Sequence, residues 1–194
     1  MKTGFEHEVI CQYDSEPIKQ YLLQNWNNLW NDVPQRKDWP AQEYTDLTLL
    51  YNLPDQQTDA FGKFHINEKI IEDTGLKKLF NELTQITGKR LGRAMFIKLP
   101  AKKSISPHID RGYHLEHCDR IHLPIITDNH VSFIINGKTY PMPAGTVSRI
   151  NNNILHSVEN NSNNDRVHLV MDFVDKDDNF YKTDKKELER FCKL

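Results

Sequence analysis

The stretch SPHIDRG, residues 106–112, carries two side chains of types that bind metal ions in proteins, His108 and Asp110. Side chains on a β-strand return to the same face at every second residue, so His108 and Asp110 point the same way if this stretch is extended. A second histidine, His156 in the run LHSV, can complete the set from a neighbouring strand. Two histidines and one carboxylate on one side of a metal ion are the ligands of non-haem Fe(II) oxygenases, and the other side stays open for co-substrate and oxygen. We therefore predict that His108, Asp110 and His156 bind a metal ion.

The segments around this stretch predict a series of short β-strands. Apolar or alternating runs span residues 91–99, 120–126, 131–135, 138–142, 145–150, 155–158 and 166–174. Asn136-Gly137 separates two of these runs and is a dipeptide that two-residue hairpin turns prefer. Short strands in this order favour an antiparallel sandwich or jelly roll, and the open end of a small barrel suits a metal site.

The N-terminal half carries helical patterns. Apolar residues fall on one helical face from Ile18 to Trp30, after Ser15 as an N-cap, and a second helix over residues 76–86 ends at Gly88. Residues 5–13 and 47–51 are strand candidates, and the charged tail ends in a helical pattern. We expect an α+β chain that forms one domain over residues 1–194. Its parts are supporting helices and strands in 1–90, a β core in 91–174 and a tail helix in 175–194.

Composition and charge exclude several classes of protein. Lys and Arg total 25 and Asp and Glu total 27, so the net charge of -2 gives no basic surface for nucleic acid or anionic membrane. No apolar run approaches the roughly 18 residues of a membrane span, and the N-terminus does not match a signal peptide. The three cysteines form no CxxC pair, which favours reduced thiols. We expect a cytoplasmic protein.

Two predicted strands place arginine and histidine opposite an apolar face. In the strand over 166–174, alternation puts Arg166 and His168 on the polar side, and Arg120 and His122 take the same kind of position in the strand over 120–126. A charged group that faces a cavity needs a partner of opposite charge, and guanidinium matches carboxylate in a bidentate pair. A dicarboxylic co-substrate that chelates the metal through a keto acid end would provide this partner for Arg166. These are the parts of 2-oxoglutarate-dependent oxidation.

Five segments of the C-terminal half agree with a known family in order and spacing. They are PHID (107–110), RIHLPI (120–125), YPMPAG (140–145), NNILHSVEN (152–160) and RVHLVMD (166–172). Together they resemble the aspartyl/asparaginyl β-hydroxylase family of 2-oxoglutarate- and Fe(II)-dependent dioxygenases, over about residues 90–174. The resemblance implies a double-stranded β-helix, the jelly roll of the cupins, with the N-terminal helices packed on it.

The resemblance also implies roles for individual residues. It implies that His108, Asp110 and His156 bind iron and that Arg166 binds the far carboxylate of 2-oxoglutarate. The pair Arg120 and His122 matches family positions that contact the co-substrate. The animal members have glycine at the position of Asp110, so this chain lies closer to the complete triad of the wider superfamily.

The function that we expect is oxidation with Fe(II), 2-oxoglutarate and O2, in which an unactivated C–H bond of an amino acid, peptide side chain or similar small molecule is hydroxylated. The alternative is a cupin-like metal-binding protein, either an isomerase or a non-catalytic sensor. Arg166 favours the oxygenase because the alternative needs no arginine at that position. The chain shows no repeat domain for docking a protein, which favours a small-molecule or amino-acid substrate and leaves the oligomeric state open.

Overall fold

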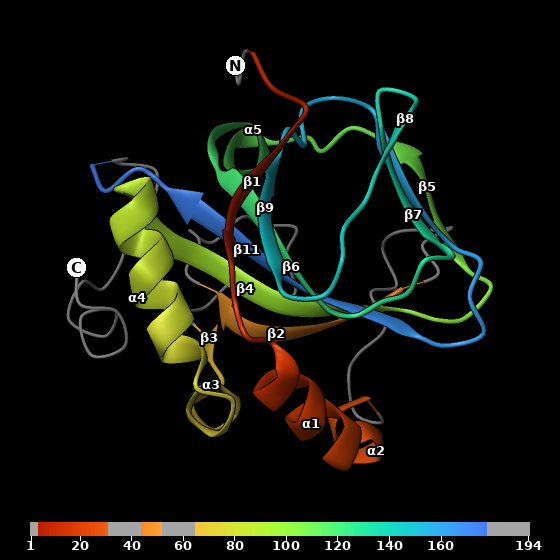
Figure 1. The fold of residues 1–194 in the computed structure, drawn as a ribbon. Coiled ribbons are helices and arrows are strands. Elements are labelled where there is room, and N and C mark those ends of the chain that lie inside the picture. Colours follow the sequence, from red (N-terminus) through yellow and green to blue (C-terminus); the bar gives the residue numbers. More distant parts are fainter. Residues whose placement is uncertain (1–3, 31–43, 52–64, 178–194) are drawn as a thin grey trace.

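The computed structural model describes residues 4–30, 44–51 and 65–177, which form two antiparallel sheets around a common interior (Figure 1). The larger sheet has the spatial order β1 (His7–Gln12), β9 (Thr146–Ile150), β6 (Asp119–Ile126), β11 (Arg166–Val174), β4 (Arg90–Leu99), β2 (Thr45–Tyr51) and β3 (His65–Ile66). The smaller sheet has the order β5 (Ser104–His108), β10 (His156–Asn160), β7 (Val131–Ile135) and β8 (Lys138–Tyr140). From β4 to β11 the chain crosses from one sheet to the other, except within the β7–β8 hairpin. This connectivity is a double-stranded β-helix, so the fold predicted for the C-terminal half is confirmed.

The larger sheet has an apolar face and a polar face because side chains alternate along its strands. The apolar face shares a core with α1 (Glu16–Gln24), α3 (Glu68–Asp73) and α4 (Leu76–Thr87). Buried members of this core are Ile18, Leu22, Ile71, Leu79, Phe80, Leu83, Phe96, Ile121, Leu123, Leu169, Met171 and Phe173. The polar face is directed toward the smaller sheet, and a pocket lies between them. The apolar core thus supports the surface that carries the candidate site.

Two turns form where the sequence predicts them. Asn136 and Gly137 both have positive φ, at 52° and 75°, as a two-residue turn between β7 and β8 requires. Helix α4 ends at Gly88, which has φ of 68° and donates its backbone N–H to the carbonyl of Thr84. Glycine takes this left-handed conformation without the steric cost that a Cβ brings.

The N-terminal helix differs from the prediction, because the helical face from Ile18 to Trp30 is divided. Helix α1 ends at Gln24 and a short helix, α2 (Trp26–Trp30), follows. Asn25 lies at the break, and both its backbone N–H and its side-chain amide donate to the carbonyl of Tyr21. Asparagine side chains compete with helical hydrogen bonds in this way. Ser15 occupies the N-cap position, but its side chain makes no capping hydrogen bond.

Three short elements were not predicted: β3, α3 and α5 (Tyr113–His117). The predicted tail helix over 175–194 lies, apart from its first three residues, outside the described residues. Among the helices that the structure describes, none is long and apolar enough to cross a membrane.

Candidate metal centre

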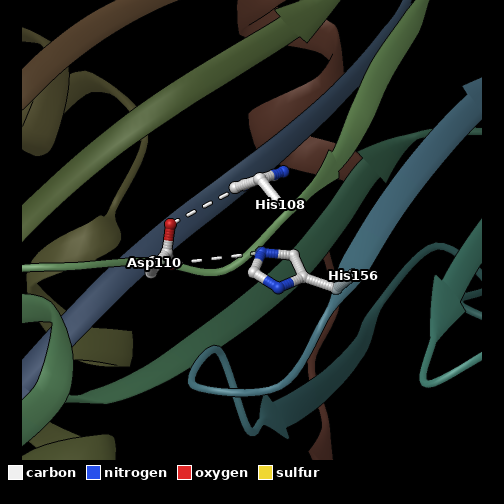
Figure 2. Close-up of side chains that lie close together, drawn as sticks. All are labelled: His108, Asp110 and His156. Carbon is white, nitrogen blue, oxygen red and sulfur yellow. Dashed lines mark ion pairs between the residues drawn. The ribbon is translucent and has the colours of Figure 1, made fainter.

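The three predicted metal ligands lie together at one end of the smaller sheet. His108 ends β5, His156 begins β10, and the two are register partners whose ring centroids are 4.3 Å apart. Asp110 follows β5, where its backbone N–H donates to the carbonyl of Asn152 at 3.1 Å. Figure 2 shows the three side chains directed toward one another. Oδ1 of Asp110 lies 3.7 Å from Nε2 of His108, and Oδ2 lies 4.0 Å from Nε2 of His156.

Both histidines present the same nitrogen to the centre. Nδ1 of His108 lies 2.8 Å from the carbonyl oxygen of Ser106, and Nδ1 of His156 lies 2.8 Å from that of Ile154. A carbonyl oxygen can only accept, so Nδ1 carries the proton in each ring and Nε2 keeps its lone pair for a metal. Burial lowers the pKa of His156, which favours the neutral, ligating form.

The donor set fits a first-row divalent metal. Ligand atoms bonded at about 2.0–2.2 Å to one ion lie about 3–3.5 Å from one another, so small side-chain movements close the present separations. Burial alone would raise the pKa of Asp110, but Arg120, His156 and His108 bring it below its usual value. The Asp110 carboxylate is therefore ionised at neutral pH, which is the form that binds a metal ion.

A pocket of about 120 Å³ extends from this centre between the two sheets. Its walls include the other three predicted site residues, Arg120, His122 and Arg166. The remainder of the wall is largely apolar, with Met95, Ile97, Ile105, Phe133, Val158 and Val170. The structure thus brings all six predicted site residues to one pocket.

Arg166 is a buried cation at the start of β11, with 2% of its surface exposed. Its Nη2 donates to Nδ1 of His168 at 2.6 Å, whereas its Nε has no partner in the described part of the chain. No described carboxylate forms an ion pair with it, and burial lowers the pKa of its guanidinium to about 9. A buried charge without a counter-ion is costly, so Arg166 needs an anion that the described residues do not supply.

Further buried polar atoms on β6, β9 and β11 lack partners. Among the described residues, neither ring nitrogen of His122, nor Nε2 of His168, nor Oγ of Ser148 has a hydrogen-bond partner. Burial, and then the charge of Arg166, lowers the pKa of His122 and His168 well below the usual value, so both rings are neutral at pH 7. Buried polar groups in native proteins are nearly always hydrogen-bonded. The unpaired set therefore marks a place for a polar, anionic ligand.

Arg120 lines the pocket but also joins two carboxylates. Its Nε and Nη2 donate to Asp172 at 2.8 and 3.0 Å, and its Nη1 donates to Asp110. No site role was predicted for Asp172, although alternation along β11 places it on the same face as His168. It is 1% exposed and is also bound by Arg93 and His114.

A second group of metal-ligand residue types, His114, Cys118 and Asp172, also lies close together. Two guanidinium groups contact Asp172, those of Arg93 and Arg120, and they would repel a cation. We assign no metal to this group.

Solved structures with a similar fold share the double-stranded β-helix of 2-oxoglutarate oxygenases. One is an oxidoreductase of the 2OG-Fe(II) oxygenase family from Burkholderia pseudomallei, at 14% identity and TM-score 0.56, covering 87% of this chain and 84% of that chain. Another is a Trichoplax adhaerens prolyl hydroxylase in complex with a peptide fragment of the hypoxia inducible factor oxygen degradation domain, at 11% identity and TM-score 0.57, covering 88% and 84%. A third is a Pseudomonas putida prolyl-4-hydroxylase, at 12% identity and TM-score 0.52, covering 88% and 92%. At these identities the likeness establishes the fold class.

The family follows from the sequence itself. Residues 58–176, more than half of the chain, match the family model described as Aspartyl/Asparaginyl beta-hydroxylase. The chain belongs to this family of 2-oxoglutarate- and Fe(II)-dependent dioxygenases, and the resemblance noted from its five segments is confirmed. A search of curated proteins found no match.

Proposed function

We propose that the protein hydroxylates an unactivated C–H bond in a reaction that consumes 2-oxoglutarate and O2 and that uses Fe(II) held by His108, Asp110 and His156. Family membership and the arrangement of the three ligand atoms support the proposal. Bound Fe(II) would supply the activation of O2, with one oxygen atom passing to the substrate and the other to succinate as CO2 is lost.

The observation that carries the proposal is the uncompensated buried charge of Arg166. A keto acid held at the metal centre by one end would have its other carboxylate in the pocket whose wall includes this guanidinium. A bidentate or single charge-assisted pair would then satisfy Arg166, and the neutral rings of His122 and His168 would provide neighbouring hydrogen-bonding groups. Of the other residues with unpaired atoms, His122 lines the pocket and would gain a partner from the co-substrate or from water beside it.

The chain's other pocket residues would orient the reactants and exclude water. The carbonyls of Ser106 and Ile154 hold the two histidines in one tautomer, and apolar side chains such as Phe133 and Val170 form dry walls. Excluding water strengthens electrostatic contacts and protects reactive species from side reactions.

We propose a small molecule, a free amino acid or a peptide side chain as the substrate. The Trichoplax adhaerens neighbour was solved with a peptide fragment, which supports keeping peptides in the search. The test is to supply purified protein with Fe(II), 2-oxoglutarate and a panel of amino acids and short peptides. We expect oxygen-dependent succinate formation, and one added oxygen atom on the true substrate by mass spectrometry.

The matched control for this test is His108→Ala, which removes one ligand. It should form no succinate above background under the same conditions. The cupin-like alternative would be favoured if the wild-type protein binds Fe(II) but forms no succinate, either with any compound of the panel or without added substrate.

A further inference from the structure

Four charged side chains alternate in sign across the interior of the fold. Arg93 on β4, Asp172 on β11 and Arg120 on β6 are register partners on adjacent strands, and Asp110 pairs with Arg120 beyond them. Asp172 accepts hydrogen bonds from Nε of Arg93 at 2.8 Å and from Nε and Nη2 of Arg120 at 2.8 and 3.0 Å. Each charge in the row has neighbours of opposite sign, which is the arrangement that buried charges need.

The last member of the row, Asp110, has two oxygen atoms in different surroundings. Oδ2 accepts from Nη1 of Arg120 and from the side-chain amide of Asn152 at 3.1 Å. Oδ1 receives no hydrogen bond from the described residues and lies 3.7 Å from Nε2 of His108. The protein therefore holds Oδ2, and Oδ1 is the oxygen left available to a metal beside the histidines.

We propose that Asp172 is a positioning residue for the metal ligand Asp110 and that it acts through Arg120. Two bonds from one carboxylate, to Nε and Nη2, fix the plane of the Arg120 guanidinium and direct Nη1 at Oδ2 of Asp110. Without the Asp172 carboxylate, Arg120 would lose both hydrogen bonds that fix its plane, and Arg93 and Arg120 would face each other with no anion between them. Nη1 of Arg120 would then no longer be held on Oδ2 of Asp110. This inference rests on the proposed metal site and adds to it the group that orients the carboxylate ligand.

The experiment measures Co(II) affinity, by competition with a chromophoric chelator, in wild-type protein, Asp172→Asn, Arg120→Gln and the double variant. Co(II) suits the same nitrogen and oxygen ligands as Fe(II) and is stable in air. Residues that orient metal ligands typically contribute about tenfold to a hundredfold in metal affinity, and we expect a loss in this range for each single variant. Because Asp172 acts through Arg120, the double variant should bind Co(II) no more weakly than the weaker single variant.

The matched control is Asp119→Asn, which neutralises another buried carboxylate of β6. Asp119 is 8% exposed and pairs with Lys89 at 3.4 Å and Arg149 at 3.3 Å. Among the described residues its ion pairs are with Lys89 and Arg149 and not with the row, so the Co(II) affinity of Asp119→Asn should equal that of the wild type. Urea unfolding of each protein shows whether it folds.

Several results would overturn the positioning role. Wild-type affinity in Asp172→Asn would do so, and so would multiplicative losses in the double variant, since these would mean that Asp172 and Arg120 act separately. If Asp172→Asn does not fold, Arg120→Gln carries the test, because it must weaken Co(II) binding when Asp110 is present and leave it unchanged in an Asp110→Ala background. Failure of the wild-type protein to bind Co(II) would instead refute the metal site itself.

Discussion

Arg166 is the residue whose removal should separate co-substrate binding from metal binding. Truncating one partner of a buried charge pair costs roughly 2–5 kcal/mol. Arg166→Ala should therefore raise the Kd for 2-oxoglutarate about thirtyfold or more, since each 1.4 kcal/mol is a factor of ten. The Kd for Co(II) should hardly change because the guanidinium is not a ligand. Isothermal titration with each ligand gives both values.

Arg149→Ala is the control for this prediction. Arg149 lies on β9 and pairs with Glu8 and Asp119, away from the pocket wall. It should leave the 2-oxoglutarate affinity unaltered. If Arg166→Ala also left it unaltered in a folded, metal-binding protein, the co-substrate assignment would fail.

Burial of His122 and His168 should make stability depend on pH. The folded protein holds the pKa of both rings well below the usual value of about 6.5, so below that pH the unfolded chain binds more protons than the folded chain. The free energy of unfolding should therefore fall as pH decreases from 7.5 to 5.5, by up to about 1.4 kcal/mol per pH unit for each histidine. Urea unfolding of the protein without metal measures the slope of this free energy against pH.

His168→Asn should make the slope shallower, whereas His130→Asn, at an exposed site, should leave it unchanged. Equal slopes in the wild type and both variants would contradict the prediction.

At the scale of elements, Gly145 lies directly before β9 and contacts Tyr13, the residue that follows β1. Its φ is +82°, its carbonyl accepts from the backbone N–H of Tyr13, and a Cβ placed on it would lie 2.8 Å from the carbonyl oxygen of Tyr13. Gly88 shares the positive φ but has open space around it. Gly88→Ala should cost about 1 kcal/mol for the left-handed conformation alone. Gly145→Ala should cost clearly more because backbone atoms must also move, and urea unfolding of the two variants compares them; equal losses would mean that the contact with Tyr13 relaxes freely.

The sequence predicts an element well when its signal is local. Asn136-Gly137 and Gly88 each specify a backbone conformation by themselves, so the hairpin and the end of α4 agree with the prediction. The break at Asn25 was missed because helical periodicity continues through it, and α5 was missed because five residues are too few to show a period. The residue types predicted that His108, Asp110 and His156 would lie together, as they do, although Asp110 follows β5 instead of continuing it; their role as metal ligands stays a prediction. The row from Arg93 to Asp110 was not predicted, since it depends on the register of three strands that are distant in sequence.

At the scale of the whole molecule, metal binding should raise global stability. A ligand that binds only the folded state adds about 2.7 kcal/mol when its concentration is 100 times its Kd. Co(II) at that excess should raise the Tm of the wild-type protein and leave that of His108→Ala unchanged. His130→Ala replaces an exposed histidine outside the pocket and should respond like the wild type. Scanning calorimetry with and without Co(II) gives the shifts, and an equal shift in His108→Ala would show that the ion binds elsewhere.

The strand order also has a consequence for how the chain acquires its activity. Strand β11, the last described strand in the sequence, pairs between β6 and β4 in the interior of the larger sheet, and β10 pairs between β5 and β7. Neither sheet can form completely before β10 and β11 leave the ribosome. Pairing between strands that are distant in sequence is the slow part of folding. A growing chain lacks His156 until β10 is made and lacks Arg166 and Asp172 until β11 is made. On the proposed assignment, an unfinished chain can assemble neither the full metal ligand set nor the co-substrate contact, so oxygen chemistry begins only when synthesis of the β-helix is complete.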